Sequence, residues 1–188
     1  MAKHVVLEGM EPRVLLAAAS GASLRIDAGG GALVDSIGRA FQPDSGFTGG
    51  QAVAAAYDVP ATTDDALYAS YRTGGDFSFF KPIANGHYAV FLDVADPTST
   101  AAGQRTFNVF AEGQQVLHEF DAYQSAGGQA QWPVAKSFDI NVSDGAIDLR
   151  FQGVVGEAIV SGIVVAPTDV PLVAQPYSWL ALSDSGHT

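Results

Sequence analysis

The chain has 188 residues, of which 47% are hydrophobic and 15% charged, and its formal net charge is −11. This composition is typical of one globular domain and excludes a largely disordered chain. So acidic a surface argues against nucleic acid and anionic membranes and suits a neutral partner or a cation better. The absence of cysteine excludes disulfides and thiolate metal sites, and no apolar run approaches the about 20 residues of a membrane span.

The first 22 residues are predicted to form a leader or flexible segment that precedes the fold. Residues 10–16 read MEPRVLL. The Glu-Pro-Arg-x-Leu-Leu core resembles a short motif near the start of large bacterial surface and secreted proteins, with Met10 where that motif has Leu. The resemblance implies export, and hence an extracellular or cell-surface location. Alternatively, residues 14–19 form a weak signal-peptide-like apolar stretch, and whether the segment is cleaved stays open.

Alternation of apolar and polar residues dominates the middle of the chain and predicts β-strands. Residues 24–28 are expected to form the first strand, and residues 51–56 could form one helical turn. Further strands are predicted over residues 66–72, 76–81, 87–93, 106–111, 114–120, 137–142 and 146–152, and over the continuous apolar run 158–165. Paired strands in succession, with no helix between them, predict an all-β fold, an antiparallel sandwich or barrel.

Short turn sequences join the predicted strands. Asn85-Gly86 is suited to a tight type I′ hairpin turn, because both residue types tolerate positive φ angles. Glu112-Gly113 and Asp144-Gly145 are expected to join the next two pairs. Beyond residue 167 the strand pattern fades, so residues 168–188 are predicted to be a tail or linker.

Short segments spread from Ile26 to Val165 resemble, in their order and spacing, the malectin domain. The segments are residues 26–30 (IDAGG), 47–50 (FTGG), 63–68 (TDDALY) with Arg72, 83–88 (IANGHY), 102–107 (AGQRTF), 120–121 (FD), 142–145 (VSDG) and 159–163 (IVSGI). The resemblance implies an antiparallel jelly-roll β-sandwich, of the malectin-like or galactose-binding-like type, over residues 23–167. It also implies binding of an oligo- or polysaccharide.

Malectin-like domains hold sugars with aromatic and acidic side chains on loops at one end of the sandwich, because an aromatic ring stacks on the apolar face of a pyranose and polar groups bind its hydroxyls. The resemblance implies that Tyr68 stacks on the sugar and that Arg72 and Asp96 bind its hydroxyl groups. Glu157 would replace an acid that the family often has at the position of Gly156. The full set of candidate carbohydrate-binding residues is Tyr68, Arg72, Asp96, Glu157, Phe47 and Tyr71.

The sequence departs from the family pattern at three places. Thr98 and Ser99 replace an aromatic pair, Thr73 replaces an aromatic residue after Arg72, and Gly156 replaces the acid. Two hypotheses follow. Either the chain is a non-catalytic carbohydrate-binding module of an exported bacterial protein, or it is a structural, adhesive or self-assembling surface-protein domain that has lost the sugar site.

Other aromatic residues could compensate for the missing ones. Tyr57, Tyr71, Tyr123 and Trp132 are predicted to lie in or beside loops, where they either contact a ligand or cover the edge of the core. The apolar residues 170–182 favour the second hypothesis, since they could pack on a neighbouring copy or on a neighbouring domain of a larger protein.

The sequence holds no constellation typical of catalysis. Its four histidines lack metal-ligand spacing, and a glycosidase would need two acids facing each other across a cleft. Asp93, Asp96 and Glu157 are the candidates, but a sandwich with short loops rarely forms a deep cleft, so we expect no enzyme activity and no catalytic residues. Calcium is the one cofactor considered, because carboxylates and loop carbonyls suit it. The candidate calcium ligands are Asp64, Asp65, Asp93 and Asp96.

Overall fold

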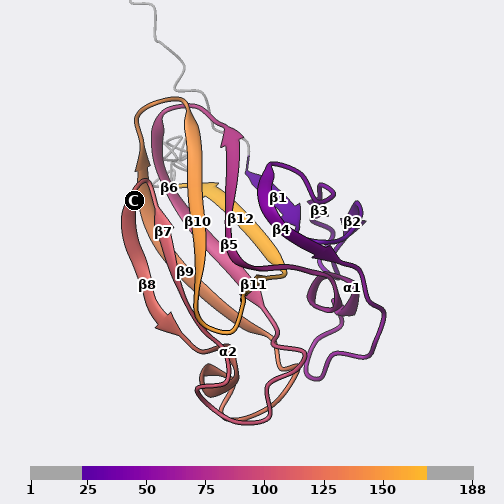
Figure 1. Cartoon of the computed structure of the whole chain (residues 1–188). Helices are drawn as coiled ribbons and strands as arrows, with labels where there is room; N and C mark the ends of the chain where they lie inside the picture. Colours follow the sequence, from indigo (N-terminus) through magenta and orange to yellow (C-terminus); the bar gives the residue numbers. More distant parts are fainter. Residues whose placement is uncertain (1–22, 169–188) are drawn as a thin grey trace, which may run out of the picture. The chain divides into compact units, whose positions relative to one another are not determined.

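The structure is a computed structural model that describes residues 23–168. The smaller of its two main β-sheets contains both the first and the last described strand. Its strands lie in the order β1 (Leu24–Asp27), β12 (Gly162–Pro167), β6 (Gly86–Val94) and β9 (Val134–Val142). All neighbours in this sheet are antiparallel. Strand β1 is therefore the edge strand of the sheet, next to β12 (Figure 1).

The larger sheet is built around the long strand β5 (Tyr71–Pro82). On one side, β5 pairs with β4 (Phe47–Val53). On its other side it pairs first with β11 (Ala158–Val160) and then with β10 (Ala146–Val155), which leads on to β7 (Thr106–Ala111) and β8 (Gln114–Phe120). A separate small hairpin joins β2 (Leu33–Val34) to β3 (Ala40–Phe41). All these pairs are antiparallel, so the predicted all-β antiparallel sandwich is confirmed (Figure 1).

The core lies between the two sheets because alternate residues of each strand point inward. In β6 the inward residues are Tyr88, Val90, Leu92 and Val94, all 2% exposed or less. The opposite sheet contributes aromatic rings; Phe77 stacks on Phe151 with 4.8 Å between the ring centroids. Each such side chain contributes about 1.5–3 kcal/mol of burial free energy. The core therefore holds the two sheets together and supports the loops that connect their strands.

One predicted strand is wrong. Residues 66–72 do not form a strand; Asp65–Ala69 form the short helix α1, and β5 begins at Tyr71. The amides of Leu67 and Tyr68 both donate to the carbonyl of Asp64, which starts the helical turn. Over only five residues, alternation is compatible with either structure, and alanine and leucine favour a helix.

Three other elements also differ from the prediction. The apolar run 158–165 is two strands in different sheets, divided at Ser161, whose amide donates to the Asp93 carbonyl. Residues 51–53 belong to β4 and form no helical turn. The helix α2 (Ala122–Ser125) was not predicted; Asp121 caps it by accepting a hydrogen bond from the Gln124 amide.

Of the three predicted hairpins only that of β7 and β8 is present; the predictions for β5 with β6 and for β9 with β10 are wrong, because each of these turns carries the chain from one sheet to the other. Glu112 and Gly113 both have positive φ, as a type I′ turn requires. Asn85 does not, and residues 83–85 instead form the connection from β5 to β6. There the amide group of Asn85 donates to the Ser143 carbonyl, so this asparagine ties together the two turns that connect the sheets.

Two predicted segments lie outside the described residues: the Glu-Pro-Arg motif, and residues 170–182 with the rest of the predicted tail. In residues 23–168, neither helix is long and apolar enough to cross a membrane.

Candidate functional site

Tyr68, the predicted stacking residue, lies on α1 and is half-buried. Its hydroxyl donates to Asp93 Oδ1 at 3.1 Å, and its ring packs beside Phe41, Leu67 and Val164. Burial raises the pKa of Tyr68 far above its ordinary value, and the neighbouring Asp93 carboxylate raises it further. The hydroxyl of Tyr68 thus serves a contact inside the domain.

Arg72 and Phe47 lie together at the irregular pairing of β4 with β5. The guanidinium of Arg72 lies 4.7 Å from the Phe47 ring centroid and pairs with Asp44 at 2.5 Å. It also donates to the Gly49 carbonyl at 2.8 Å, where the register of β4 shifts. The donors of Arg72 and one face of the Phe47 ring are therefore used to hold β4 on the sheet.

Asp96 is buried and organises the loop after β6. Its carboxylate accepts hydrogen bonds from the Thr98 amide, from the amide and hydroxyl of Ser99, and from Arg105 Nε. Burial alone would raise the pKa of Asp96, but these hydrogen bonds and the charge of Arg105 outweigh it and hold the pKa below its ordinary value. Asp96 thus fixes Arg105, a residue that the sequence did not single out as a site.

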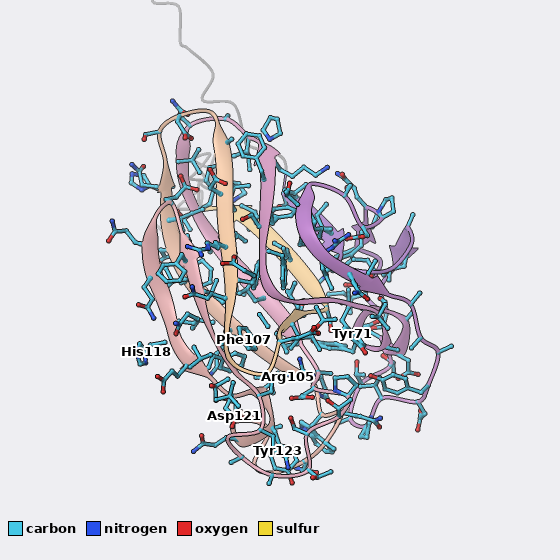
Figure 2. The ribbon with its side chains drawn as sticks, viewed as in Figure 1. Tyr71, Arg105, Phe107, His118, Asp121 and Tyr123 are labelled. Carbon is cyan, nitrogen blue, oxygen red and sulfur yellow. The ribbon has the colours of Figure 1, made fainter. Side chains whose placement is uncertain are left out.

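Glu157 is exposed and lies next to this loop. Arg105 Nη1 donates to the Glu157 carbonyl at 2.7 Å, and the Thr73 hydroxyl donates to the Glu157 carboxylate at 2.9 Å. We call Thr73, Asp96, Arg105 and Glu157 the end-loop cluster. Tyr71 lies two residues before Thr73 on β5 and hence on the same side of the strand; Figure 2 shows Tyr71 and Arg105 toward the same end of the sandwich. Two predicted residues, Asp96 and Glu157, are thus brought together, whereas Tyr68 and Phe47 make their contacts elsewhere.

The four candidate calcium ligands accept hydrogen bonds from protein donors. Asp64 accepts from the amide and hydroxyl of Ser36, and Asp65 from the Val59 amide. Asp93 accepts from Tyr68, and Asp96 accepts as described above. Across residues 23–168, no three His, Asp or Glu side chains are grouped closely enough to hold a metal ion. Calcium binding stays a prediction.

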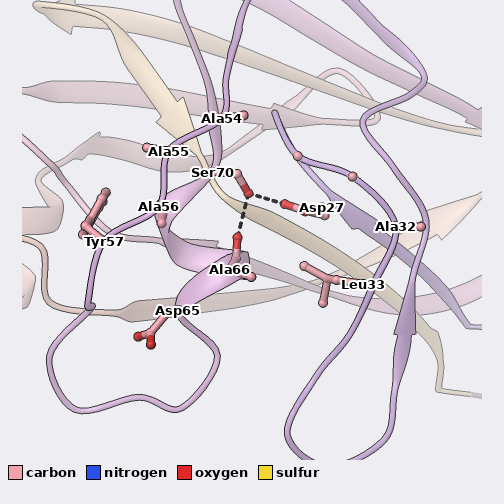
Figure 3. A pocket seen from close by; sticks show the side chains of 13 residues that line it. Asp27, Ala32, Leu33, Ala54, Ala55, Ala56, Tyr57, Asp65, Ala66 and Ser70 are labelled. Carbon is pink, nitrogen blue, oxygen red and sulfur yellow. Dashed lines mark hydrogen bonds between the residues drawn. The ribbon is translucent and has the colours of Figure 1, made fainter.

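A pocket of about 420 Å³ opens beside α1 (Figure 3). One wall is the segment Ala54–Tyr57 that follows β4, and the facing wall is the loop from Gly30 to Leu33. Asp27 and Ser70 form its polar floor, and Asp65 stands at its side. The complete lining is Asp27, Gly30, Gly31, Ala32, Leu33, Ala54, Ala55, Ala56, Tyr57, Asp65, Ala66, Ala69 and Ser70.

Asp27 is only 2% exposed. The Ser70 hydroxyl donates to Asp27 Oδ1 at 2.6 Å and lies 2.9 Å from the carbonyl oxygen of Ala66 (Figure 3). Burial raises the pKa of Asp27 to about 6; the Ser70 hydrogen bond opposes this and the nearby Asp44 charge adds to it. A buried carboxyl with a shifted pKa at a pocket floor marks this pocket as a candidate binding site.

Two glycines shape the pocket. Gly29 has φ +84°, and a Cβ there would lie 2.1 Å from the Tyr71 carbonyl oxygen. A Cβ on Gly30 would lie 2.0 Å from Asp27 Oδ2. Only glycine therefore lets this loop lie against the start of β5 and above the Asp27 carboxyl group. The IDAGG segment was a family landmark, but nothing in the sequence indicates that it faces Ala54–Tyr57 across a pocket.

Tyr57 connects the pocket with the end-loop cluster. Its ring lines the pocket, and its hydroxyl is buried without a hydrogen-bond partner in the described part of the chain. Burial raises the pKa of Tyr57, and the nearby Tyr71 and Asp96 raise it further. Tyr57 thus lines the pocket and lies near Asp96 of the end-loop cluster.

Comparison with known proteins agrees with this fold. The family model of the malectin domain matches residues 22–174. A kinesin-like protein of Oryza sativa subsp. japonica, KIN-14E, is 34% identical over 135 residues, which are 65% of this chain and 12% of that protein.

Solved structures show the same sandwich. A β-glucuronidase of Bacteroides uniformis superposes with a TM-score of 0.67 at 20% identity, over 78% of this chain and 18% of that one. The ANX2 ectodomain from Arabidopsis thaliana gives 0.65 at 17% identity, over 76% and 48%. The chain spans well under two thirds of each of these relatives. The family match covers most of the chain, and the chain therefore belongs to the malectin domain family.

Proposed function

We propose that this domain is a non-catalytic carbohydrate-binding module and that its sugar lies in the pocket beside α1. The observation that carries the proposal is the division of the pocket into an apolar wall and a polar floor. Methyl groups of Ala54–Ala56 and the Tyr57 ring face a floor made by the Asp27 carboxyl and the Ser70 hydroxyl. A pyranose has the matching character, with apolar C–H faces and polar edges.

The size of the pocket supports the same proposal. Its volume of about 420 Å³ lies within the roughly 300–1,000 Å³ of small-molecule sites. Tyr57 leads from the pocket to the end-loop cluster, where the exposed Glu157 would contact further units of a longer glycan. We expect weak affinity, on the order of micromolar to millimolar, because a few contacts must offset the cost of ordering the sugar.

We propose binding without catalysis because the likeness to the β-glucuronidase covers only 18% of that enzyme, and its activity is a property of that whole protein. The ectodomain relative supports an extracellular or cell-surface location, and export from a bacterium remains part of the proposal. Screening the chain against chromogenic glycosides tests the enzyme alternative, since measurable hydrolysis would overturn the non-catalytic assignment.

A glycan array probed with the full chain tests the binding proposal. Ala55 is an exposed residue of the pocket wall, so Ala55→Trp is expected to fill the pocket and weaken glycan binding at least tenfold. Ala135 is exposed on β9, outside the pocket lining, and Ala135→Trp is the matched control with unchanged binding. Loss of binding in Glu157→Gln but not in Ala55→Trp would move the site to the end-loop cluster.

A blank array from folded protein would favour the structural or self-assembling alternative. One observation supports that alternative: Val34 and Ile37, on and beside the small hairpin, are 67% and 72% exposed. Light scattering over a range of protein concentrations tests it, since a mass that rises with concentration indicates self-association.

A further inference from the structure

We propose that the pocket selects sugars that carry a free, protonated amino group over their neutral counterparts. This inference rests on the proposed function, which it narrows to the class of amino sugars with unacylated amines. It is carried by the charge of the pocket lining, by the position of Asp27, and by the way in which Asp27 is left without a cationic partner.

The lining of the pocket has one sign of charge. It contains two carboxyl groups, those of Asp27 and Asp65, and none of its thirteen residues is basic. One oxygen of Asp65 accepts from the Val59 amide at 2.9 Å, which fixes that carboxylate at the pocket. Two carboxyl groups at one pocket, with no basic residue in its lining, attract a cation into it.

Asp27 lacks the cation that a buried carboxylate ordinarily has. None of the ion pairs within residues 23–168 includes it; the arginine nearest in sequence, Arg25, does not pair with it, and Arg72 is paired with Asp44. Ser70 contacts Oδ1 alone, and Oδ2 lies against Gly30, where a Cβ would approach it to 2.0 Å. An ammonium group in the pocket would supply the missing partner.

The Ser70 hydroxyl indicates how the Asp27 carboxyl group is accommodated without a cationic partner. A serine has one hydroxyl proton, yet both Asp27 Oδ1 and the Ala66 carbonyl lie within hydrogen-bond distance of it. Ser70 therefore donates its proton to one of these two acceptors at a time, and while it donates to Ala66 the Oδ1 atom of Asp27 lacks a donor unless the carboxyl group carries a proton. An ammonium ligand would take the place of that proton.

This exchange couples binding to pH. In the empty pocket the pKa of Asp27 is about 6, raised by burial and by Asp44, and Asp65 and Tyr57 are the other titratable groups of the lining. An ammonium ligand binds the ionised form, so it must displace the proton in acid solution. The ionised fraction of a group with this pKa rises about tenfold from pH 5 to pH 7, and the affinity for the amine should rise by about the same factor.

Titration calorimetry of the full chain tests the inference with two matched ligands: glucosamine oligosaccharides with free amines, and fully N-acetylated oligosaccharides of the same length. At pH 7 we expect the free-amine ligand to bind at least tenfold more tightly, and this preference to shrink about tenfold at pH 5. Asp27→Asn should abolish the preference and its pH dependence but keep binding of the acetylated ligand. Asp139→Asn, an exposed carboxylate of β9, is the control and should change neither.

The outcomes separate the inference from the proposed function. Equal, pH-independent binding of both oligosaccharides overturns the amine inference and leaves the carbohydrate function standing. Equal binding of a sugar-free diamine such as putrescine upholds ammonium selectivity and overturns the carbohydrate function. Binding of none of the three ligands by folded protein overturns both. If Asp27→Asn does not fold, Asp65→Asn, which keeps an acceptor for the Val59 amide, replaces it and is expected to weaken the free-amine ligand alone.

Discussion

The carboxyl group of Asp27 ties the stability of the domain to pH. Its pKa is about 6 in the folded chain, against an ordinary value of 3.8, so the folded state holds the proton more tightly than the unfolded state does. The stabilisation is fully present below about pH 4 and is lost as the pH rises through about 6, a change of about 3 kcal/mol.

We predict that Asp27→Asn removes the part of the stability loss at rising pH that is due to ionisation of Asp27. Urea unfolding of both proteins between pH 4.5 and 7.5 should show the variant gaining stability relative to the wild type as the pH rises. Burial also raises the pKa of Asp93, but that carboxyl is present in both proteins, so their difference isolates Asp27. Parallel pH profiles would contradict the prediction.

Gly30 and Gly31 form a matched pair. A Cβ on Gly30 would lie 2.0 Å from Asp27 Oδ2, whereas a Cβ on Gly31 would have no neighbour within 4 Å. We expect Gly30→Ala to cost about 2 kcal/mol or more, because the loop or the carboxyl must move, and Gly31→Ala to change stability by less than about 0.5 kcal/mol. Thermal unfolding measures both, and equal melting temperatures would show that the loop yields freely.

Tyr68 distinguishes the role implied by the family from the role that its contacts indicate. Tyr68→Phe keeps the ring but removes the donor to the half-buried Asp93, and we expect a loss of about 1–3 kcal/mol with glycan binding unchanged. Tyr123→Phe, at a half-buried tyrosine of α2, is the control. Unchanged stability together with lost glycan binding would restore Tyr68 as the stacking residue.

At the scale of the element, β4 depends on Arg72. The strand changes register between Gly49 and Gln51, and Arg72 binds the Gly49 carbonyl, Asp44 and the Phe47 ring at that point. A lysine cannot make these contacts together, because it lacks the planar fork of the guanidinium. The position of β4 in turn sets where Ala54–Tyr57 lies, and hence the shape of the pocket.

We expect Arg72→Lys to cost about 1–3 kcal/mol. The control is Arg150→Lys on the same sheet, because the Arg150–Asp76 pair is 50% and 47% exposed and solvent screens such a pair, so that the substitution should change stability little. Chemical denaturation compares the two variants. Equal losses would mean that Arg72 is no more than a surface charge.

The elements differed in how well the sequence predicted them. Strands β7 and β8 have the predicted bounds, because the Glu112-Gly113 turn between them marks where one strand ends and the next begins. Helix α1 was predicted as a strand because five residues are too few for its period to show. The run 158–165 has no polar residue but Ser161, so the sequence could not show that the chain changes sheets there.

For the molecule as a whole, the sequence predicted the family and the sandwich but not the pocket. Asp27 and Tyr68 belong to separate segments that match the family, and the sequence does not indicate how these segments lie in space. The pocket arises where residues 27–33, 54–57 and 65–70 meet, and those contacts depend on register and loop packing that one sequence does not encode locally. Conversely, Arg72 and Asp96 carried the expected residue types, yet the folded domain uses their polar atoms internally.

The pairing of β1 with β12 determines how the described domain can be inserted into a longer polypeptide. Leu24 lies opposite Val165, and residues opposite each other in an antiparallel pair have their Cα atoms only about 4.5–5.5 Å apart. Both ends of the sandwich therefore leave from adjacent points on one sheet edge. Such a module can be inserted into a surface loop of a host protein, or circularly permuted with a short linker, without distorting either sheet.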